Sequence, residues 1–569
     1  MPRSAPRAGA RVVQTRRVQP PPRLARLARP RRTSARVLAR LARRRITAVS
    51  VALLVVFAVL GGRLVQLQAL SGGRYERLAL AQRLGRVTLP AARGSIFDRH
   101  GRDLALSVDA PTVWANPRVV GDPHYAAAQL APVVGVDEAT LEHRLSDRKF
   151  QFVYIARRVD GATAAQVKAL RLPGVAFMNE PARHYPAGTL AGPIIGKVGT
   201  EDTGLAGVEY AYESVLEGKP GEIVSERDVR GREIPRTVRR ERPARRGTDL
   251  VLTIDEALQY QSERSLVDQV AASGAKAGMA VVVDIKTGDI LSMVTALGPS
   301  NGQPARPANA NERNRPLTDL FEPGSTNKVI TIATALEDKL IGPQTPFQVP
   351  DHIAVGGANY QDDHAHAMQT WSPTDIMRES SNVGTIMIAK QLDAAGQGPE
   401  RLDTALRAFG LGETTAVEFP GQPQGLLLKP NDYYSTGMAS VPIGYGVSVS
   451  AQQMLDVYTT IANRGVTVPP RLVQATIDGT GTQQPRPLAR GHRVVSDATA
   501  RTVTDMLTQV VSGGTGACAA IPGYTVSGKT GTSRKPLNTG GYSKQTMASF
   551  IGFAPAEAPR VATIVVLDA

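Results

Sequence analysis

The chain has 569 residues, enough for two or three domains with a sizeable core. Its formal net charge of +17 would suggest nucleic-acid binding, but residues 1–45 contain 15 arginines and no acidic residue. The remaining 52 basic and 50 acidic residues nearly balance, so the charge belongs to one tail and argues against a nucleic-acid partner.

The chain begins with this tail and an apolar segment. Residues 1–45 are rich in arginine, proline and alanine, which predicts a disordered segment. The 17 residues from Ile46 to Gly62 carry no charge, and apolar residues continue beyond them, which predicts a transmembrane helix over 46–66. The arginines predict a cytoplasmic tail, so we expect a single-pass protein of the plasma membrane with the rest of the chain outside the cytoplasm.

The next region, residues 67–248, shows no pattern typical of catalysis. Residues 92–105 read A-R-G-S-I-F-D-R-H-G-R-D-L-A, and the turn residues in this stretch predict a hairpin. Residues 183–191 and 204–218 combine glycines with charges that are able to pair. A charged, irregular stretch then ends before a strand-like run at Asp249, so we place a domain boundary at 248/249. The single cysteine, Cys518, excludes an intrachain disulfide.

The stretch F-E-P-G-S-T-N-K, residues 321–328, contains the first candidate catalytic residues. Pro323 and Gly324 precede a mostly apolar run that predicts a buried helix. Ser325 and Lys328 are three residues apart and therefore share a helix face, as a nucleophile and its base require. To act as a base, Lys328 needs a pKa lowered by roughly 3 units through burial and a neighbouring cation.

Two later motifs supply partners. R-E-S-S-N-V-G places Ser380 and Asn382 before another apolar run, and G-K-T-G-T places Lys529 and its neighbours between glycines. This set, in this order, is the established signature of penicillin-binding proteins and class A β-lactamases. An earlier K-T-G at 286–288 lies between two strand-like runs, so we interpret it as a hairpin turn.

The resemblance extends over most of the chain. The box at 93–101 resembles the R-G-x-I-x-D-R-N-G motif of class B penicillin-binding proteins, with His100 where asparagine is usual. F-E-P-G-S-T resembles the septal, FtsI-type branch. The resemblance implies a membrane anchor and an α+β ectodomain: a pedestal over 67–248, then a transpeptidase domain over 249–569 with helices on both sides of an antiparallel sheet. Family members usually continue past this point to a terminal helix, so we expect a C-terminal truncation.

The resemblance also implies a reaction, a peptidoglycan D,D-transpeptidase that cross-links stem peptides ending in D-alanyl-D-alanine and is acylated by β-lactams. Ser325 would be the nucleophile and Lys328 its base, with Ser380 as proton relay. Asn382 would bond the substrate amide and orient Lys328, and Lys529 would lower the pKa of Lys328.

The K-T-G-T strand would hold the substrate. The hydroxyls of Thr530 and Thr532 would bind its carboxylate, Gly531 would let the strand approach closely, and the N–H groups of Ser325 and Thr532 would form the oxyanion hole. No metal or organic cofactor is needed. Asp362, Asp363, His364 and His366 fit no standard metal motif.

Other functions stay open. A β-lactamase would need a deacylating carboxylate, and the class A pattern E-x-x-L-N is absent. A membrane-anchored β-lactam sensor and an elongation-type transpeptidase are the alternatives. Because no residues remain for a glycan polymerase, a separate SEDS-type glycosyltransferase (FtsW-like) and other divisome membrane proteins are the implied partners.

Overall fold

The computed structural model describes residues 35–70, 73, 84–226, 234, 236–237, 240–396, 398–433, 435–537 and 539–569. The chain divides into two compact units, Met1–Leu84 and Gly85–Ala569. In the first unit, helix α1 (Ala35–Val65) continues as one π-helical turn, η1 (Gln66–Leu70). The stretch Ala39–Ala69, with a mean hydropathy of 2.4 in its most apolar window, is long and apolar enough to cross a membrane.

The predicted helix over 46–66 is present, but it begins earlier than expected. Residues 35–45, which we expected to be disordered, belong to α1. Alanine, leucine and arginine have high helix propensity, so a helix nucleated in the apolar segment extends backward through them. The rest of the predicted disordered tail, residues 1–34, lies outside the described residues.

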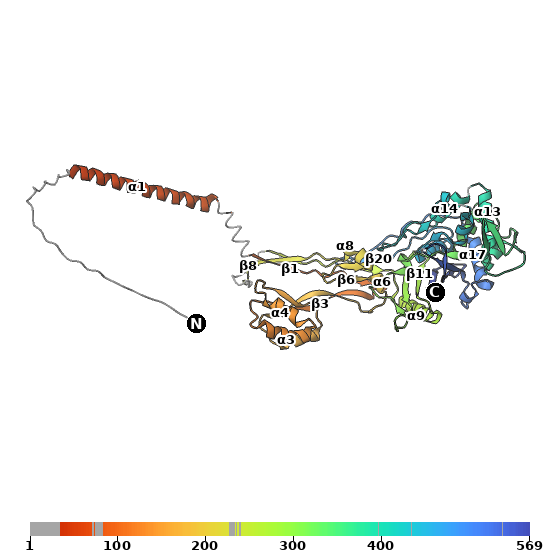
Figure 1. The fold of residues 1–569 in the computed structure, drawn as a ribbon, viewed down its shortest axis with the longest axis horizontal. Helices are drawn as coiled ribbons and strands as arrows, with labels where there is room; N and C mark the ends of the chain where they lie inside the picture. Colours follow the sequence, from red (N-terminus) through yellow and green to blue (C-terminus); the bar gives the residue numbers. More distant parts are fainter. Residues whose placement is uncertain are drawn as a thin grey trace, which may run out of the picture. The chain divides into compact units, whose positions relative to one another are not determined.

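The second unit begins with a mixed α/β region (Figure 1). Its strands are β1 (Leu84–Leu89), β2 (Ile96–Phe97), β3 (Asp103–Ala115), β4 (Val153–Ala156), β5 (Val175–His184), β6 (Lys197–Val198), β7 (Gly204–Ala206), β8 (Gly221–Glu226) and β9 (Arg240–Arg242). Its helices are α3 (Pro123–Val134), α4 (Glu138–Ser146), α5 (Gly161–Ala169), α6 (Gly192–Ile195), α7 (Gly207–Ala211) and α8 (Glu213–Leu216). The predicted hairpin at 92–105 is confirmed, since β2 and β3 pair antiparallel.

Helices α3, α4 and α5 form a lobe against β3 and β4. Its core contains Leu130, Leu141, Ile155 and Val167, all at most 2% exposed. Asp122 caps α3 by accepting a hydrogen bond from the Tyr125 N–H. The lobe therefore has its own small core, separate from the main core, whose residues run from Ile96 to Val566.

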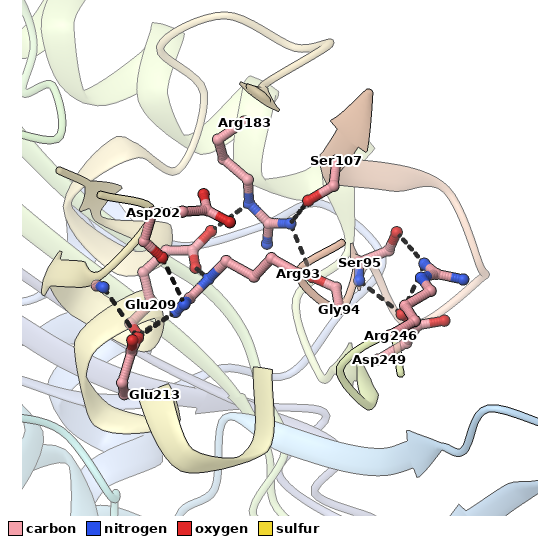
Figure 2. Close-up of polar contacts among 11 residues, drawn as sticks. Arg93, Gly94, Ser95, Ser107, Arg183, Asp202, Glu209, Glu213, Arg246 and Asp249 are labelled. Carbon is pink, nitrogen blue, oxygen red and sulfur yellow. Dashed lines mark hydrogen bonds and ion pairs between the residues drawn. The ribbon is translucent and has the colours of Figure 1, made fainter. Parts of the chain in front are cut away.

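The charges expected to pair do so in a buried network (Figure 2). Arg93 Nε donates to Glu209 Oε2 at 2.5 Å, and its Nη2 donates to Glu213 Oε2 at 2.6 Å. Arg183 Nε donates to the other oxygen of Glu209 at 2.6 Å. Arg93 and Glu209 are 1% and 0% exposed, so three sequence-distant segments are joined by charges shielded from water.

Replacing Glu209 by alanine is expected to destabilise this region strongly, because it leaves the buried guanidinium groups of Arg93 and Arg183 without their shared carboxylate. Breaking a buried pair in this way costs about 3–5 kcal/mol. Denaturant unfolding of the ectodomain measures the change. The control is Glu312→Ala, which removes an exposed pair with Arg306 and should cost about 0–1 kcal/mol. Equal effects of the two substitutions would contradict the prediction.

A sheet crosses the predicted boundary at 248/249. Strand β10 (Asp249–Leu252) pairs in parallel with β2 and antiparallel with β20 (Val473–Ile477), which pairs with β21 (Gln483–Pro485). The strand order is β21-β20-β10-β2-β3-β4, with β5 also paired to β3. The boundary stays a prediction, and around it the two regions share backbone hydrogen bonds.

The C-terminal region is built on a six-stranded antiparallel sheet in the order β13-β12-β11-β24-β23-β22. These strands are β11 (Ala277–Asp284), β12 (Ile290–Leu297), β13 (Arg306–Pro307), β22 (Ser527–Pro536), β23 (Tyr542–Ala554) and β24 (Val561–Asp568). Its short strands are β14 (Phe347–Val349), β15 (His352–Val355), β16 (Ala358–Gln361), β17 (Gln369–Trp371), β18 (Leu426–Leu427) and β19 (Val447–Ser448).

The helices of this region are α9 (Glu256–Ser273), α10 (Arg315–Thr318), α11 (Lys328–Glu337), α12 (Pro373–Glu379), α13 (Asn382–Ala394), α14 (Gly398–Ala408), α15 (Gly437–Ser440), α16 (Ala451–Ala462) and α17 (Asp497–Gly513). The 3-10 turns are η2 (Gly324–Asn327), η3 (Pro430–Asp432), η4 (Val441–Ile443) and η5 (Ala517–Ala519).

Helices cover both faces of the six-stranded sheet, as predicted. Leu266 and Val270 of α9 pack with Ala280 on one face, whereas Val281 and Met454 of α16 belong to the main core on the other. Ala280 and Val281 are consecutive in β11, and their opposite directions follow from the two-residue period of a strand. The K-T-G copy at 286–288 forms the β11–β12 turn, as predicted, with Lys286 exposed.

Candidate active site

Ser325 lies in the 3-10 turn η2, directly before α11. A 3-10 turn has three residues per turn, so positions three apart are nearly eclipsed and Ser325 and Lys328 stand on one side. Ser325 is half-buried, whereas Lys328 is 0% exposed. The predicted buried helix is confirmed: Val329, Ile330 and Ile332 are fully buried. The serine thus stands at the surface end of a rigid, apolar support.

The amine of Lys328 is held by Ser380. Lys328 Nζ donates to the Ser380 carbonyl at 2.5 Å and lies 3.4 Å from Ser380 Oγ. Ser380 ends α12 with φ +59°, a left-handed conformation that is uncommon for serine. This conformation turns the carbonyl and the hydroxyl of Ser380 toward the same amine.

Lys529 approaches Ser380 from β22. Lys529 Nζ donates to Ser380 Oγ at 2.8 Å and to the Thr530 carbonyl at 3.1 Å. Both lysine side chains are 0% exposed. One hydroxyl therefore bridges two amines that come from segments about 200 residues apart, so the structure brings residues of the three motifs together.

Burial lowers the pKa of Lys328 to about 8, against the opposing influence of Asp362 and Asp363. Burial also lowers the pKa of Lys529, and the charge of Lys328 lowers it further. The burial that we expected to lower the pKa of Lys328 is present, and a contribution of Lys529 to this shift stays a prediction. Two ammonium groups around one buried hydroxyl repel each other, so the pair loses a proton far more readily than two exposed lysines.

Two glycines allow β22 to meet the serine turn. A Cβ on Gly531 would lie 2.8 Å from Thr326 Cγ2, and a Cβ on Gly324 would lie 2.8 Å from the Thr532 carbonyl. Gly324 also has φ +55°, which side chains other than glycine rarely adopt. The predicted close approach at Gly531 is therefore present, and it brings Thr532 next to the residue that precedes the nucleophile.

The remaining predicted residues occupy the edges of this arrangement. Thr530 Oγ1 donates to Thr515 Oγ1 at 3.1 Å, and Thr532 is exposed on the same face of β22. Asn382 Nδ2 donates to the Gln361 carbonyl at 2.9 Å. Among the described residues Asn382 has no hydrogen bond to Lys328, so its predicted role in orienting that amine stays a prediction.

Two acidic residues near the site were not assigned to it from the sequence. Asp362 accepts hydrogen bonds from Ser381 Oγ and from the Val383 N–H, which fixes the start of α13 beside Ser380. Glu322 accepts hydrogen bonds from the Gly446 N–H and from Tyr542. Asp362 fits no standard metal motif, and no local pattern in the sequence marks it for another role. Glu322, by contrast, lies directly before Pro323 within the F-E-P-G-S-T motif.

Comparison with known proteins identifies the family. A model of the penicillin-binding protein transpeptidase domain matches residues 278–569, and a model of the penicillin-binding protein dimerisation domain matches residues 88–252. The chain belongs to the class B penicillin-binding proteins.

Individual relatives agree with this assignment. The penicillin-binding protein PbpB of Mycolicibacterium smegmatis is 34% identical over 561 residues, covering 91% of this chain and 85% of the relative. The peptidoglycan D,D-transpeptidase FtsI of Escherichia coli is 32% identical over 532 residues, covering 91% of this chain and 86% of the relative. The resemblance of this penicillin-binding protein to the FtsI type is thus confirmed.

A solved structure gives the same result for the fold. Penicillin-binding protein 3 of Mycobacterium tuberculosis, crystallised in complex with aztreonam, superposes with a TM-score of 0.64 at 30% identity. The match covers 85% of this penicillin-binding protein and 91% of the solved chain. The order of a pedestal-type domain followed by a transpeptidase domain is therefore shared.

Proposed function

We propose that this protein is a serine-type peptidoglycan D,D-transpeptidase of the division septum that is also acylated by β-lactams. The observation that carries the proposal is the bridging of Lys328 and Lys529 by Ser380, beside the turn that holds Ser325. The names of the relatives, FtsI and PbpB, support the same activity and the septal role.

In the proposed reaction, Ser325 Oγ attacks the carbonyl of the penultimate D-alanine while Lys328 Nζ takes the hydroxyl proton. The tetrahedral intermediate then collapses, the peptide bond breaks, and the proton held by Lys328 passes through Ser380 Oγ to the departing amine of the terminal D-alanine. An amine of a second stem peptide attacks the ester, forms the new amide and returns the proton to Ser325. β-Lactams enter by the same first step.

The other residues have binding roles in this proposal. Lys529 Nζ donates a hydrogen bond to the substrate carboxylate, the hydroxyls of Thr530 and Thr532 bind it, and Asn382 bonds the substrate amide. The N–H groups of Ser325 and Thr532 stabilise the oxyanion, and the close approach of Thr532 to Gly324, which leaves no space for a Cβ there, supports this assignment.

We also propose the membrane arrangement and the partners. The arginine-rich tail lies in the cytoplasm, α1 spans the plasma membrane once, and the catalytic region lies outside. Because transpeptidation needs newly made glycan strands, an FtsW-like SEDS glycosyltransferase and other divisome membrane proteins are the proposed partners.

A direct assay tests the proposed function. The full chain in detergent is incubated with a stem pentapeptide ending in D-alanyl-D-alanine and with an amine acceptor. We expect release of D-alanine in equal amount to a new amide, and inhibition of both by a β-lactam. Release of D-alanine without amide formation would indicate a hydrolase, and absence of any release would contradict the proposal.

The rate of β-lactam acylation is expected to depend on pH through Lys328. Because its pKa is about 8, roughly one molecule in ten carries the neutral amine at pH 7. Lowering the pH further protonates the base, so the rate should fall about tenfold per pH unit below 7 and level off above 8 to 9. Stopped-flow measurement of acylation between pH 5.5 and 9.5, values chosen to lie roughly around this pKa, checks the prediction, and a flat profile would contradict it.

A further inference from the structure

A groove of about 900 Å³ lies in the three-helix lobe and is formed entirely by residues between Val133 and Thr163. Strand β4 forms one side of it, and the end of α3 and the start of α5 form the others. Val134 and Phe152 are among its apolar walls. None of the residues assigned to the active site contributes to it.

The groove runs along an open sheet edge. Strand β4 is the last strand in its sheet and pairs only with β3 among the described strands. A strand paired on one side offers backbone N–H and C=O groups to an added strand. One of these carbonyls, that of Tyr154, accepts a hydrogen bond from the Arg144 side chain at 3.2 Å, which a competing strand can replace.

Aromatic side chains line the groove, and one more packs against them. Phe152 stacks on Trp114 with ring centroids 5.0 Å apart and meets Tyr154 edge to face at 4.8 Å. Phe150 and Phe152 are nevertheless 56% and 40% exposed. Large aromatic side chains that are held in place yet left in contact with water are typical of interaction sites.

The charged side chains that line the groove are mostly basic, which favours an acidic partner. Three arginines line it, and one of them, Arg157, is already paired with Glu180 and Glu201. Among the described residues Arg144 and Arg158 form no ion pair with a carboxylate, although Arg158 lies within electrostatic reach of Asp202. The buried Nε of Arg158 has no hydrogen bond. The one acidic side chain of the lining, Asp160, is occupied in capping α5.

We propose that this groove binds an extended acidic segment of a partner protein, which adds to β4 as a further strand. Alternate side chains of the segment pack on Phe152 and Val134, and its carboxylates pair with Arg144 and Arg158. This binding function is separate from the proposed catalysis, because it uses no residue of the active site.

A model peptide tests the proposal on the full chain in detergent. The probe is a capped peptide of about eight residues, the span of a typical strand, that alternates glutamate with valine, and the comparison peptide alternates lysine with valine. We expect the acidic peptide to protect the amides of Val153–Ala156 from hydrogen exchange, and the basic peptide to leave them unchanged. Equal protection by both peptides, or protection by neither, would overturn the proposal.

Variants locate the site. Arg144→Glu and, separately, Arg158→Glu are expected to weaken binding of the acidic peptide at least about tenfold, since each turns an attraction into a repulsion. Lys168→Glu is the matched control, because it reverses an exposed charge on α5 outside the groove and should leave binding unchanged. Loss of binding in all three variants would show a general charge effect and overturn the proposal.

Two further measurements separate the outcomes. Analytical ultracentrifugation that shows a dimer broken by Arg144→Glu would identify a second copy of the chain as the occupant and refute a foreign partner. Labelling by a fluorescent penicillin reports on the active site independently. Retained labelling in the groove variants, together with lost peptide binding, is the expected result.

Discussion

Replacing Ser325 by alanine is expected to abolish covalent labelling by a fluorescent penicillin. The ester that retains the label needs the Ser325 oxygen, which lies one helical turn before Lys328. Ser380 Oγ lies 3.4 Å from Lys328, but it is also bonded to Lys529, and Ser380 is 9% exposed. Labelling is measured by gel fluorescence on the purified full chain. We expect the fluorescent band of the Ser325→Ala variant to disappear completely.

The matched control is Ser300→Ala. Ser300 is the central residue of G-P-S-N-G, a G-x-S-x-G sequence that in esterases marks the nucleophile, but here it occupies an exposed loop bridged to Gln303. This variant should be labelled as the wild type is. Persistent labelling of Ser325→Ala would refute the assignment of the nucleophile, and loss of labelling only in Ser300→Ala would move it to that loop.

Replacing Lys328 by methionine is expected to slow acylation by a factor of about 10² to 10⁴, the usual contribution of a positioned general base. Methionine preserves most of the apolar volume of the buried side chain and removes the amine, so the fold should tolerate it. The second-order rate constant of acylation measures the effect. The loss should persist at pH 9.5, a value about 1.5 units above the pKa of Lys328, because no base remains to be deprotonated.

Lys390→Met provides the control for this substitution, since Lys390 is an exposed lysine of α13. Its acylation rate should equal that of the wild type. A thermal unfolding curve for each variant shows that the fold is intact. Acylation of Lys328→Met within a few-fold of the wild type, with the fold preserved, would assign the base to another group.

The sequence predicted the parts of the site that depend on short-range pattern. Ser325 and Lys328 share a side because their spacing matches one helical turn, and the copy of K-T-G at 286–288 was recognised as a turn by its flanking strands. The hairpin at 92–105 followed from turn residues. Each of these inferences needs only a few neighbouring residues, and the structure agrees with each.

The details that depend on tertiary contacts were not accessible. Serine has no preference for the left-handed conformation of Ser380, so nothing in R-E-S-S-N-V-G indicated that its hydroxyl would bridge both lysines. Asp362 accepts a hydrogen bond from the hydroxyl of Ser381, which lies 19 residues later in the chain, and no local pattern connects the two residues. Likewise, the arginine-rich composition of residues 35–45 predicted disorder, but these residues are helical because they continue the helix of the adjoining apolar segment.

The position of β24 has a consequence for biosynthesis. This strand, Val561–Asp568, lies between β11 and β23 in the sheet, although it follows every other strand in the chain. The strand that carries Lys529 is attached through β23, which lacks its inner neighbour until β24 has been translated. We therefore expect a nascent chain released before residue 561 to contain every side chain of the active site and still to react with no penicillin.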